Sequence, residues 1–403
     1  MRRRGRIAGG AALLAGVVTI LLLTSGREPP GHRSLPGGRT QPLLVGVAED
    51  AVKTPDPHAA QQKLDVVESA GFDALVVSQT WRRGQRAPSA SDAALLRTTA
   101  QAARKDGVRV FLVLGNGLSG GTPRTPAQRA QFARFAAATA RAVPQIRDFV
   151  IGNEPNLNTF WLPQFDPRGR DVAAGQYLDL LARTYDALKA VSPKLDVIGG
   201  ALAPRGSDNP KLARATHSPT AFIRDLGADY RASRRTRPIM DGFAIHPYMN
   251  GSKIPPTGSH PDSSTITIAD YDKLTALLRD TFAGTEQPGA SLPIYYTEFG
   301  VQTQIPPKNA HGYLHLRSVF ANDAVPASVQ ADYYRQALEL AACQPRVRAL
   351  FIFHVWDEPD LHGWQSGLYY VNGAPKPSLS PFRRAAGATR DGTIVNDCAG
   401  PTG

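Results

Sequence analysis

Cysteine is scarce in this chain, with two among 403 residues. So few cysteines exclude a disulfide-rich scaffold and a zinc site built from four cysteines. Also missing is a run of basic residues with interleaved aromatic side chains, which a nucleic-acid-binding surface would show. Disorder is excluded too, because 42% of the residues are hydrophobic. What remains is a globular protein of one large domain or two ordinary ones.

The net charge of +12 is concentrated at the N-terminus. Residues 1–41 contain seven arginines and one glutamate and carry +6, which leaves +6 for the other 362 residues. That remainder is too mild to indicate a polyanionic partner. We therefore expect no nucleic-acid partner.

The N-terminal segment has the layout of an export signal. Residues 1–6 read MRRRGR, and residues 7–23 are apolar without a charge. These 17 residues are slightly long for a cleaved signal and slightly short for a membrane span. Residues 1–26 are therefore predicted to be a signal peptide or a membrane anchor, followed by a Pro/Gly-rich linker at 27–41. The protein is expected to be secreted or at the cell surface, contacting the membrane only through residues 7–23 if they are not cleaved.

The two cysteines lie near the C-terminus. An exported protein can hold a disulfide, and a bond between Cys343 and Cys398 would tie down the C-terminal tail at 391–403. We expect this bond, and two free thiols are the alternative.

Eight short apolar runs divide the chain between residues 42 and 390. They are nearly continuous rather than alternating, which is typical of parallel strands buried on both faces. The runs are 43–48, 74–78, 108–115, 149–152, 195–199, 242–246, 294–297 and 349–354.

Amphipathic stretches of helical length separate these runs, among them 58–70, 91–105, 126–143, 174–191 and 329–343. Helix starts are marked by Ser91-Asp92 and by Thr125-Pro126. Eight strands alternating with helices predict a single (β/α)8 TIM barrel over 42–390. The alternative, an open doubly wound sheet, would usually have a Gly-rich turn after its first strand, and the sequence there reads VGVAEDAVKTPDP.

Polar and aromatic clusters mark four of the strand ends. In a (β/α)8 barrel the C-terminal ends of the strands form one rim, which carries the catalytic groups. Glu154 follows the fourth run and Glu298 the seventh, so the two carboxylates can face each other across the barrel mouth. Two carboxylates about 5–5.5 Å apart are what retaining glycoside hydrolysis needs.

These residues carry a resemblance. Asn153-Glu154-Pro155 after the fourth run, with Glu298 at the seventh, resembles clan A retaining glycoside hydrolases, near family 39 and the cellulase-like family 5. The resemblance implies that Glu154 is the acid/base and Glu298 the nucleophile.

Further roles follow from the same resemblance. Asn153 would bind the substrate 2-hydroxyl, Tyr248 would hold Glu298, and His246 would line the same pocket. Trp356 would lie under the reacting sugar. The remaining tryptophans also follow predicted strands and are expected to offer aromatic faces to sugars: Trp81, Trp161 and Trp364.

The predicted function is hydrolysis of O-glycosidic bonds in an oligo- or polysaccharide through a covalent glycosyl-enzyme, and the resemblance implies that these bonds are β. The alternatives are a carbohydrate-binding barrel without catalysis and a transglycosylase that remodels a cell-surface polysaccharide. No cofactor is implied. His311 and His315 are four residues apart, but Gly312 disfavours a helix there, so no metal site is expected. The oligomeric state is not predicted.

Overall fold

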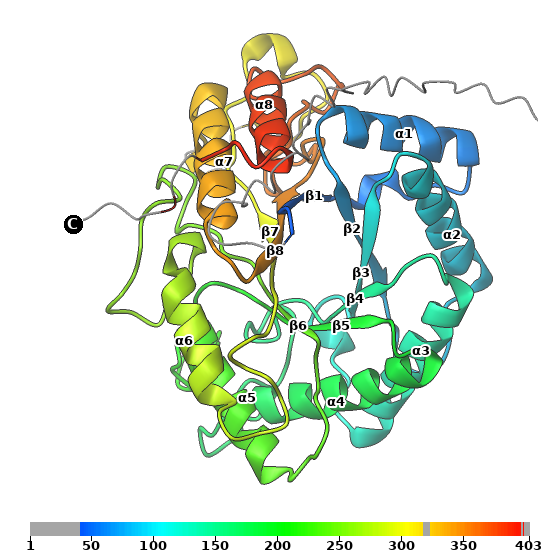
Figure 1. Cartoon of the computed structure of the whole chain (residues 1–403), viewed down its shortest axis with the longest axis vertical. Coiled ribbons are helices and arrows are strands. Elements are labelled where there is room, and N and C mark those ends of the chain that lie inside the picture. Colours follow the sequence, from blue (N-terminus) through cyan, green and yellow to red (C-terminus); the bar gives the residue numbers. More distant parts are fainter. Residues whose placement is uncertain (1–40, 317–322, 396–397, 399–403) are drawn as a thin grey trace, which may run out of the picture. The chain divides into compact units, whose positions relative to one another are not determined.

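A closed barrel of eight parallel strands forms the centre of the fold in the computed structural model, which describes residues 41–316, 323–395 and 398 (Figure 1). Each strand pairs with its neighbours in sequence, and β8 closes the ring on β1. The predicted barrel is therefore confirmed. The strands are β1 (Leu44–Ala48), β2 (Ala74–Thr80), β3 (Arg109–Gly115), β4 (Asp148–Ile151), β5 (Asp196–Leu202), β6 (Gly242–Ile245), β7 (Ile294–Phe299) and β8 (Val347–Phe353).

Helices surround the barrel, one after each strand (Figure 1). They are α1 (Pro57–Ser69), α2 (Ala90–Lys105), α3 (Pro126–Ala142), α4 (Ala173–Val191), α5 (Pro219–Ala232), α6 (Tyr271–Thr281), α7 (Ala327–Ala342) and α8 (Leu379–Arg390). Short 3-10 helices occupy some loops: η2 (Asp50–Val52), η3 (Ser119–Gly121), η4 (Ile268–Asp270) and η5 (Pro307–Asn309).

Several helices begin at a polar N-cap followed by proline. The Thr125 side chain accepts from the Gln128 N–H in a capping box, and Pro126 opens α3. Proline suits this position because its missing N–H would have no helical partner there. The start predicted for α2 at Ser91-Asp92 is wrong by a short step, because Ser89 is the N-cap and accepts from the Asp92 N–H.

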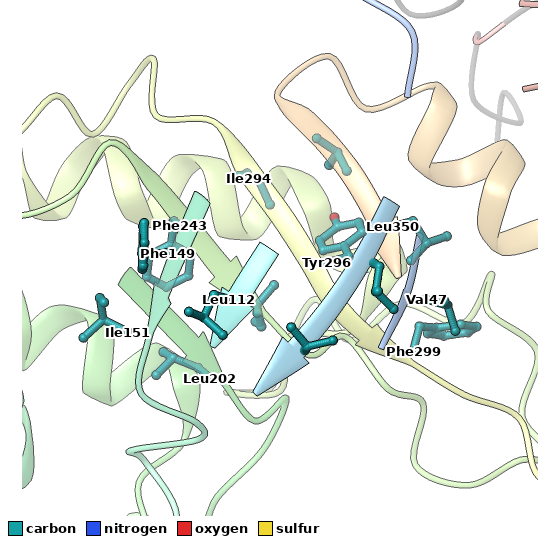
Figure 2. Close-up of a cluster of buried hydrophobic side chains, with 14 of the residues drawn as sticks. Val47, Leu112, Phe149, Ile151, Leu202, Phe243, Ile294, Tyr296, Phe299 and Leu350 are labelled. Carbon is teal, nitrogen blue, oxygen red and sulfur yellow. The ribbon is translucent and has the colours of Figure 1, made fainter. Parts of the chain in front are cut away.

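Both faces of the strands are apolar, which explains the continuous runs in the sequence. Outward-pointing side chains pack beneath the helices in one large cluster, and Figure 2 labels ten of them, among them Leu112, Phe149 and Phe243. Inward-pointing neighbours, such as Phe111 and Val150, form a second cluster inside the barrel. The period-two geometry of a strand sends adjacent residues to opposite faces.

The barrel interior is filled by side chains. The ring of Phe111 lies 5.1 Å from that of Phe351 and 5.8 Å from that of Tyr295. Phe351 uses space that Gly46 leaves open, since a Cβ at Gly46 would lie 2.2 Å from its ring. With its interior packed, the barrel can accept a ligand only at one of its ends.

The C-terminal part is covalently fixed, because Cys343 at the end of α7 and Cys398 form a disulfide. The predicted signal or anchor at 1–26 and almost all of the linker at 27–41 lie outside the described residues. Within the described part of the chain, no helix has the length and apolar character needed to cross a membrane.

Candidate active site

Glu154 lies in a tight turn directly after β4. Gly152 and Glu154 both have positive φ, +89° and 41°, and the Glu154 N–H donates to the Ala201 carbonyl at 2.8 Å. Tyr177 stabilises this turn from below, donating its hydroxyl to the Ile151 carbonyl at 2.7 Å. A non-glycine residue in the left-handed region is strained and needs such support. The turn therefore fixes where the Glu154 side chain begins.

Glu298 is the next-to-last residue of β7, and one imidazole links it to Glu154. The Nδ1 atom of His246, just after β6, lies 3.0 Å from Glu154 Oε1 and 3.5 Å from Glu298 Oε2. Tyr248 donates its hydroxyl to Glu298 Oε2 at 3.1 Å. Three strand ends thus bring together four of the predicted site residues.

Enclosure and neighbouring charges set the protonation of this group. Burial, together with the charge of Glu154, raises the pKa of Glu298 above its ordinary value, while His246 and the Tyr248 hydrogen bond oppose the rise. Burial lowers the pKa of His246, but the two carboxylates outweigh it and the net pKa is raised. Burial and the charge of Glu298 raise the pKa of Tyr248, so its hydroxyl remains a donor.

Above these residues lies a cavity of about 940 Å³, near the upper end of the range for small-molecule sites. Asn153, Glu154, Tyr248 and Glu298 line it. The rest of its wall comes mainly from the loops after β5, β6 and β7, which the sequence shows as unusually long. The cavity therefore opens at the C-terminal rim of the barrel, where Glu154 and Glu298 lie.

One wall of the cavity is aromatic. Trp364, from the loop after β8, lies 4.9 Å from the Tyr248 ring and 5.6 Å from the Phe353 ring, measured between ring centres. All three side chains line the cavity. An aromatic face next to two carboxylates suits a sugar ring, whose C–H groups pack on aromatic surfaces while its hydroxyls bind polar groups.

The other three tryptophans lie elsewhere. Trp81 is fully buried, and its indole N–H donates to the Gln85 carbonyl at 2.9 Å. Trp161 is also buried, with its ring 5.9 Å from Tyr177. Trp356 packs near Tyr369, with ring centres 6.5 Å apart. None of the three is among the described residues that line the cavity.

Two residues near the site had no predicted role. Glu49, at the end of β1, accepts from the backbone N–H of Val355 at 3.0 Å and so holds the turn after β8. His354 has φ of 77° and lies near Glu49, with Nδ1 3.6 Å from Glu49 Oε2. Its charge lowers the pKa of Glu298. Glu49 and His354 both follow a strand, and these positions could have indicated from the sequence that they lie near the site.

Asp357 and Glu358 also follow β8, and the structure gives them structural contacts. Asp357 is fully buried against Lys376 at 2.6 Å and accepts from the Tyr313 hydroxyl. Glu358 Oε2 accepts from the backbone N–H of Trp364 at 2.6 Å. These bonds fold the loop that presents Trp364.

Metal-ligating side chains gather in two places in the described part of the chain: His315, Asp360 and His362, and Asp171, His217 and Asp225. Neither trio includes a residue that lines the cavity.

Solved structures with the same architecture were found. The chain covers 64% of a family 39 glycoside hydrolase from Bacteroides cellulosilyticus WH2, with 87% of its own residues aligned, 20% identity and a TM-score of 0.59. The fold is shared with glycoside hydrolases. A monomeric β-xylosidase from Caulobacter crescentus CB15 matches over 86% of this chain and 69% of that one, with 18% identity and a TM-score of 0.52.

A GH5_18 protein from Streptomyces cattleya, solved in complex with GlcNAc, matches over 87% of this chain and 81% of that one, with 17% identity and a TM-score of 0.56. No family model matches the sequence, and a search of curated proteins finds no match. At these identities the likeness establishes the fold, and the function has to be argued from the site.

Proposed function

We propose that this protein is a retaining glycoside hydrolase. The observation that carries the proposal is the shared contact of Glu154 and Glu298 with His246 on the floor of an open, aromatic-walled cavity. Paired carboxylates on the C-terminal rim of a (β/α)8 barrel suit glycosidic bond cleavage. The glycoside hydrolases of the same fold are consistent with this chemistry.

The spacing of the two carboxylates favours retention of configuration. Both contact the same Nδ1 atom, so Glu154 Oε1 and Glu298 Oε2 can be no farther apart than the sum of those two short distances. Carboxyl groups about 5–5.5 Å apart act by double displacement, whereas separations of about 6.5–9.5 Å leave room for a water and invert. The shared imidazole therefore excludes a wide separation of these two oxygens, which is the arrangement that inversion uses.

The neighbours of the two glutamates suggest their roles. Glu298 is held by the Tyr248 hydroxyl and would attack the anomeric carbon, forming the glycosyl-enzyme. Glu154 would give its proton to the departing oxygen and then take one from the incoming water. Trp364 would pack against a bound sugar, and Asn153 would bind one of its hydroxyls.

A β-linked oligo- or polysaccharide is the proposed substrate class. A cavity of about 940 Å³ exceeds what a single sugar ring needs, and one of the structural neighbours is a β-xylosidase. A transglycosylase would use the same residues, with a sugar in place of water as acceptor.

The test uses the full chain and a panel of aryl β-glycosides and β-linked polysaccharides. We expect release of reducing sugar by the wild type and by Glu339→Gln, a control on α7 whose carboxylate pairs with Arg335. Glu298→Gln should be inactive. Proton NMR of the first product should show the β-anomer. An α-anomer as first product would contradict retention, and equal activity of all three proteins would contradict the site.

We also propose that the protein acts outside the cytoplasm. Stable disulfides form in oxidising compartments, and Cys343 and Cys398 form one. Residues 1–26 would supply the export signal or anchor. Fractionation of the native producer, with N-terminal sequencing of the mature chain, should find the protein in the membrane or the medium; recovery in the cytosol would contradict the proposal.

A further inference from the structure

Arg205 stands out among the charged side chains of the cavity. It lies three residues after the end of β5 and lines the cavity together with Glu154. The other charged residues among the described part of the lining are carboxylates: Glu154, Glu298 and Asp323. Asp323 accepts from the Ser252 N–H at 2.6 Å, which commits it to holding the loop after β6.

The guanidinium of Arg205 is positioned but not neutralised. Its Nη1 donates to the Met249 carbonyl at 3.1 Å, which connects the loop after β5 to the loop after β6. No carboxylate of the described residues lies within ion-pair distance of it. The residue as a whole is exposed. Its other N–H groups therefore remain available to a ligand that enters the cavity.

Arg205 follows β5, the strand that pairs with β4, so it lies on the Glu154 side of the cavity. Desolvation lowers the pKa of Arg205, and the charge that opposes this effect is that of Glu154. The charge of Glu154 offsets part of this loss of hydration, and no carboxylate of the described residues lies within ion-pair distance to offset the rest. An anionic ligand group would offset the remainder.

We propose that Arg205 recognises an anionic group, a carboxylate or a sulfate, on the part of the substrate that lies on the Glu154 side. This rests on the proposed function, in which Glu154 protonates the departing oxygen, so the anionic sugar would be on the leaving-group side. The substrate class is thereby narrowed to acidic polysaccharides.

The chemistry of the guanidinium fits this role. Its planar set of N–H donors matches carboxylate and sulfate oxygens in pairs. The Met249 hydrogen bond already orders the side chain, so less conformational freedom is lost on binding. Without Arg205, an anionic sugar would face Glu154 and Glu298 with no cation from the described lining to offset their repulsion.

The test begins with binding, which does not require turnover. Full-length Glu298→Gln, with and without Arg205→Gln, is run by affinity electrophoresis in gels containing glucuronoxylan, pectin or hyaluronan, each beside its carboxyl-reduced form. Carrageenan and its desulfated form test the sulfate source. Arg205→Lys keeps the charge without the paired donors, and thermal melting checks the fold.

We expect retardation by at least one acidic polymer and weaker retardation by its matched neutral form. Arg205→Gln should weaken binding to the acidic form about 10–100-fold, the range of a hydrogen-bonded charge pair, and change binding to the neutral form less than about twofold. The effect should shrink at high salt. The affinity of Arg205→Lys for the acidic form should lie between those of the protein with Arg205 and of Arg205→Gln.

The outcomes separate this inference from the proposed function. Selective binding without any hydrolysis by the wild type would support Arg205 and overturn the glycosidase. Hydrolysis of neutral polymers that is indifferent to Arg205→Gln would support the glycosidase and overturn this inference. If Arg205→Gln weakened binding to the acidic and neutral forms equally, Arg205 would have only a structural role. That result would also overturn this inference.

Discussion

The two ends of strand β4 each carry a carboxylate, and their surroundings differ. Asp148 begins the strand and is buried, and its two oxygens accept from Arg109 Nε and Nη2 at 2.8 and 2.6 Å. Glu154 follows the strand and shares an imidazole with Glu298. No arginine or lysine within the described residues pairs with either glutamate.

A permanent cation neutralises a buried carboxylate and turns it into a structural part. A titratable imidazole leaves the carboxylates free to gain and lose protons, which chemistry requires. The amino end of the barrel is therefore expected to contribute stability, and the carboxyl end is expected to contribute activity at some cost in stability.

The largest effect should come from Glu298→Gln, which tests the carboxyl end. We expect activity to fall at least ~10,000-fold, because no nucleophile remains. Melting temperature at pH 7 should not fall. The pKa of Glu298 is raised on folding, so the stability it contributes at low pH is lost as pH rises through that value, and the neutral amide avoids this loss. A melting temperature lowered by several degrees would contradict this account, because Glu298 at the carboxyl end would then contribute stability as Asp148 does at the amino end.

Glu154→Gln should have the next largest effect, and it should depend on the leaving group. Loss of a general acid/base lowers the rate about 100–10,000-fold where the leaving group needs a proton. A dinitrophenyl leaving group needs none, so bond cleavage should be nearly normal and slow deglycosylation should give a burst of dinitrophenol. Stopped-flow absorbance would detect the burst. Equal losses on sugar and dinitrophenyl leaving groups would remove Glu154 from this role.

Asp148→Ala tests the amino end. We expect a loss of about 2 kcal/mol of unfolding free energy, below the usual 3–5 kcal/mol for breaking a buried pair because Arg109 is 47% exposed. The kcat of the folded protein should stay within about twofold. Urea unfolding and steady-state kinetics measure the two quantities. A large fall in kcat with unchanged stability would reverse the assignment of the two ends.

Tyr248→Phe should have the smallest effect and sharpens the account of the glutamate pair. The Tyr248 hydrogen bond lowers the pKa of Glu298, so its loss should raise that pKa further. The nucleophile must be ionised, and the acidic limb of kcat/KM against pH should therefore move upward, by about 0.5–1 unit for a bond of ordinary strength. A limb that moves to lower pH would show that another group controls it.

The barrel and the positions of its strand ends could be predicted from the sequence, because a parallel strand buried on both faces is a continuous apolar run. The runs ending near Ile151 and Thr297 located β4 and β7, and so the two glutamates, without any tertiary information. Helices α5 and α6 were not among the stretches named from the sequence, and each follows a long irregular loop.

The direction in which each side chain points could not be predicted from the sequence. Trp81 and Trp364 both follow strands, yet one ring turns into the packing against Phe132 and the other onto Tyr248. Arg205 gave no signal because one arginine in a loop looks like any solvated charge. Its position matters only once β4 and β5 are known to be neighbours.

The measurement that tests the central claim most directly is intact-mass analysis of the full chain after exposure to 2-deoxy-2-fluoro β-glycosides with good leaving groups. The fluorine slows hydrolysis of a glycosyl-enzyme, so the account predicts a mass gain of one fluorosugar on the wild type and on Glu339→Gln. Peptide mapping should place the sugar on Glu298, and Glu298→Gln should stay unlabelled. An adduct on another residue, or no adduct from any sugar that the wild type hydrolyses, would contradict the account.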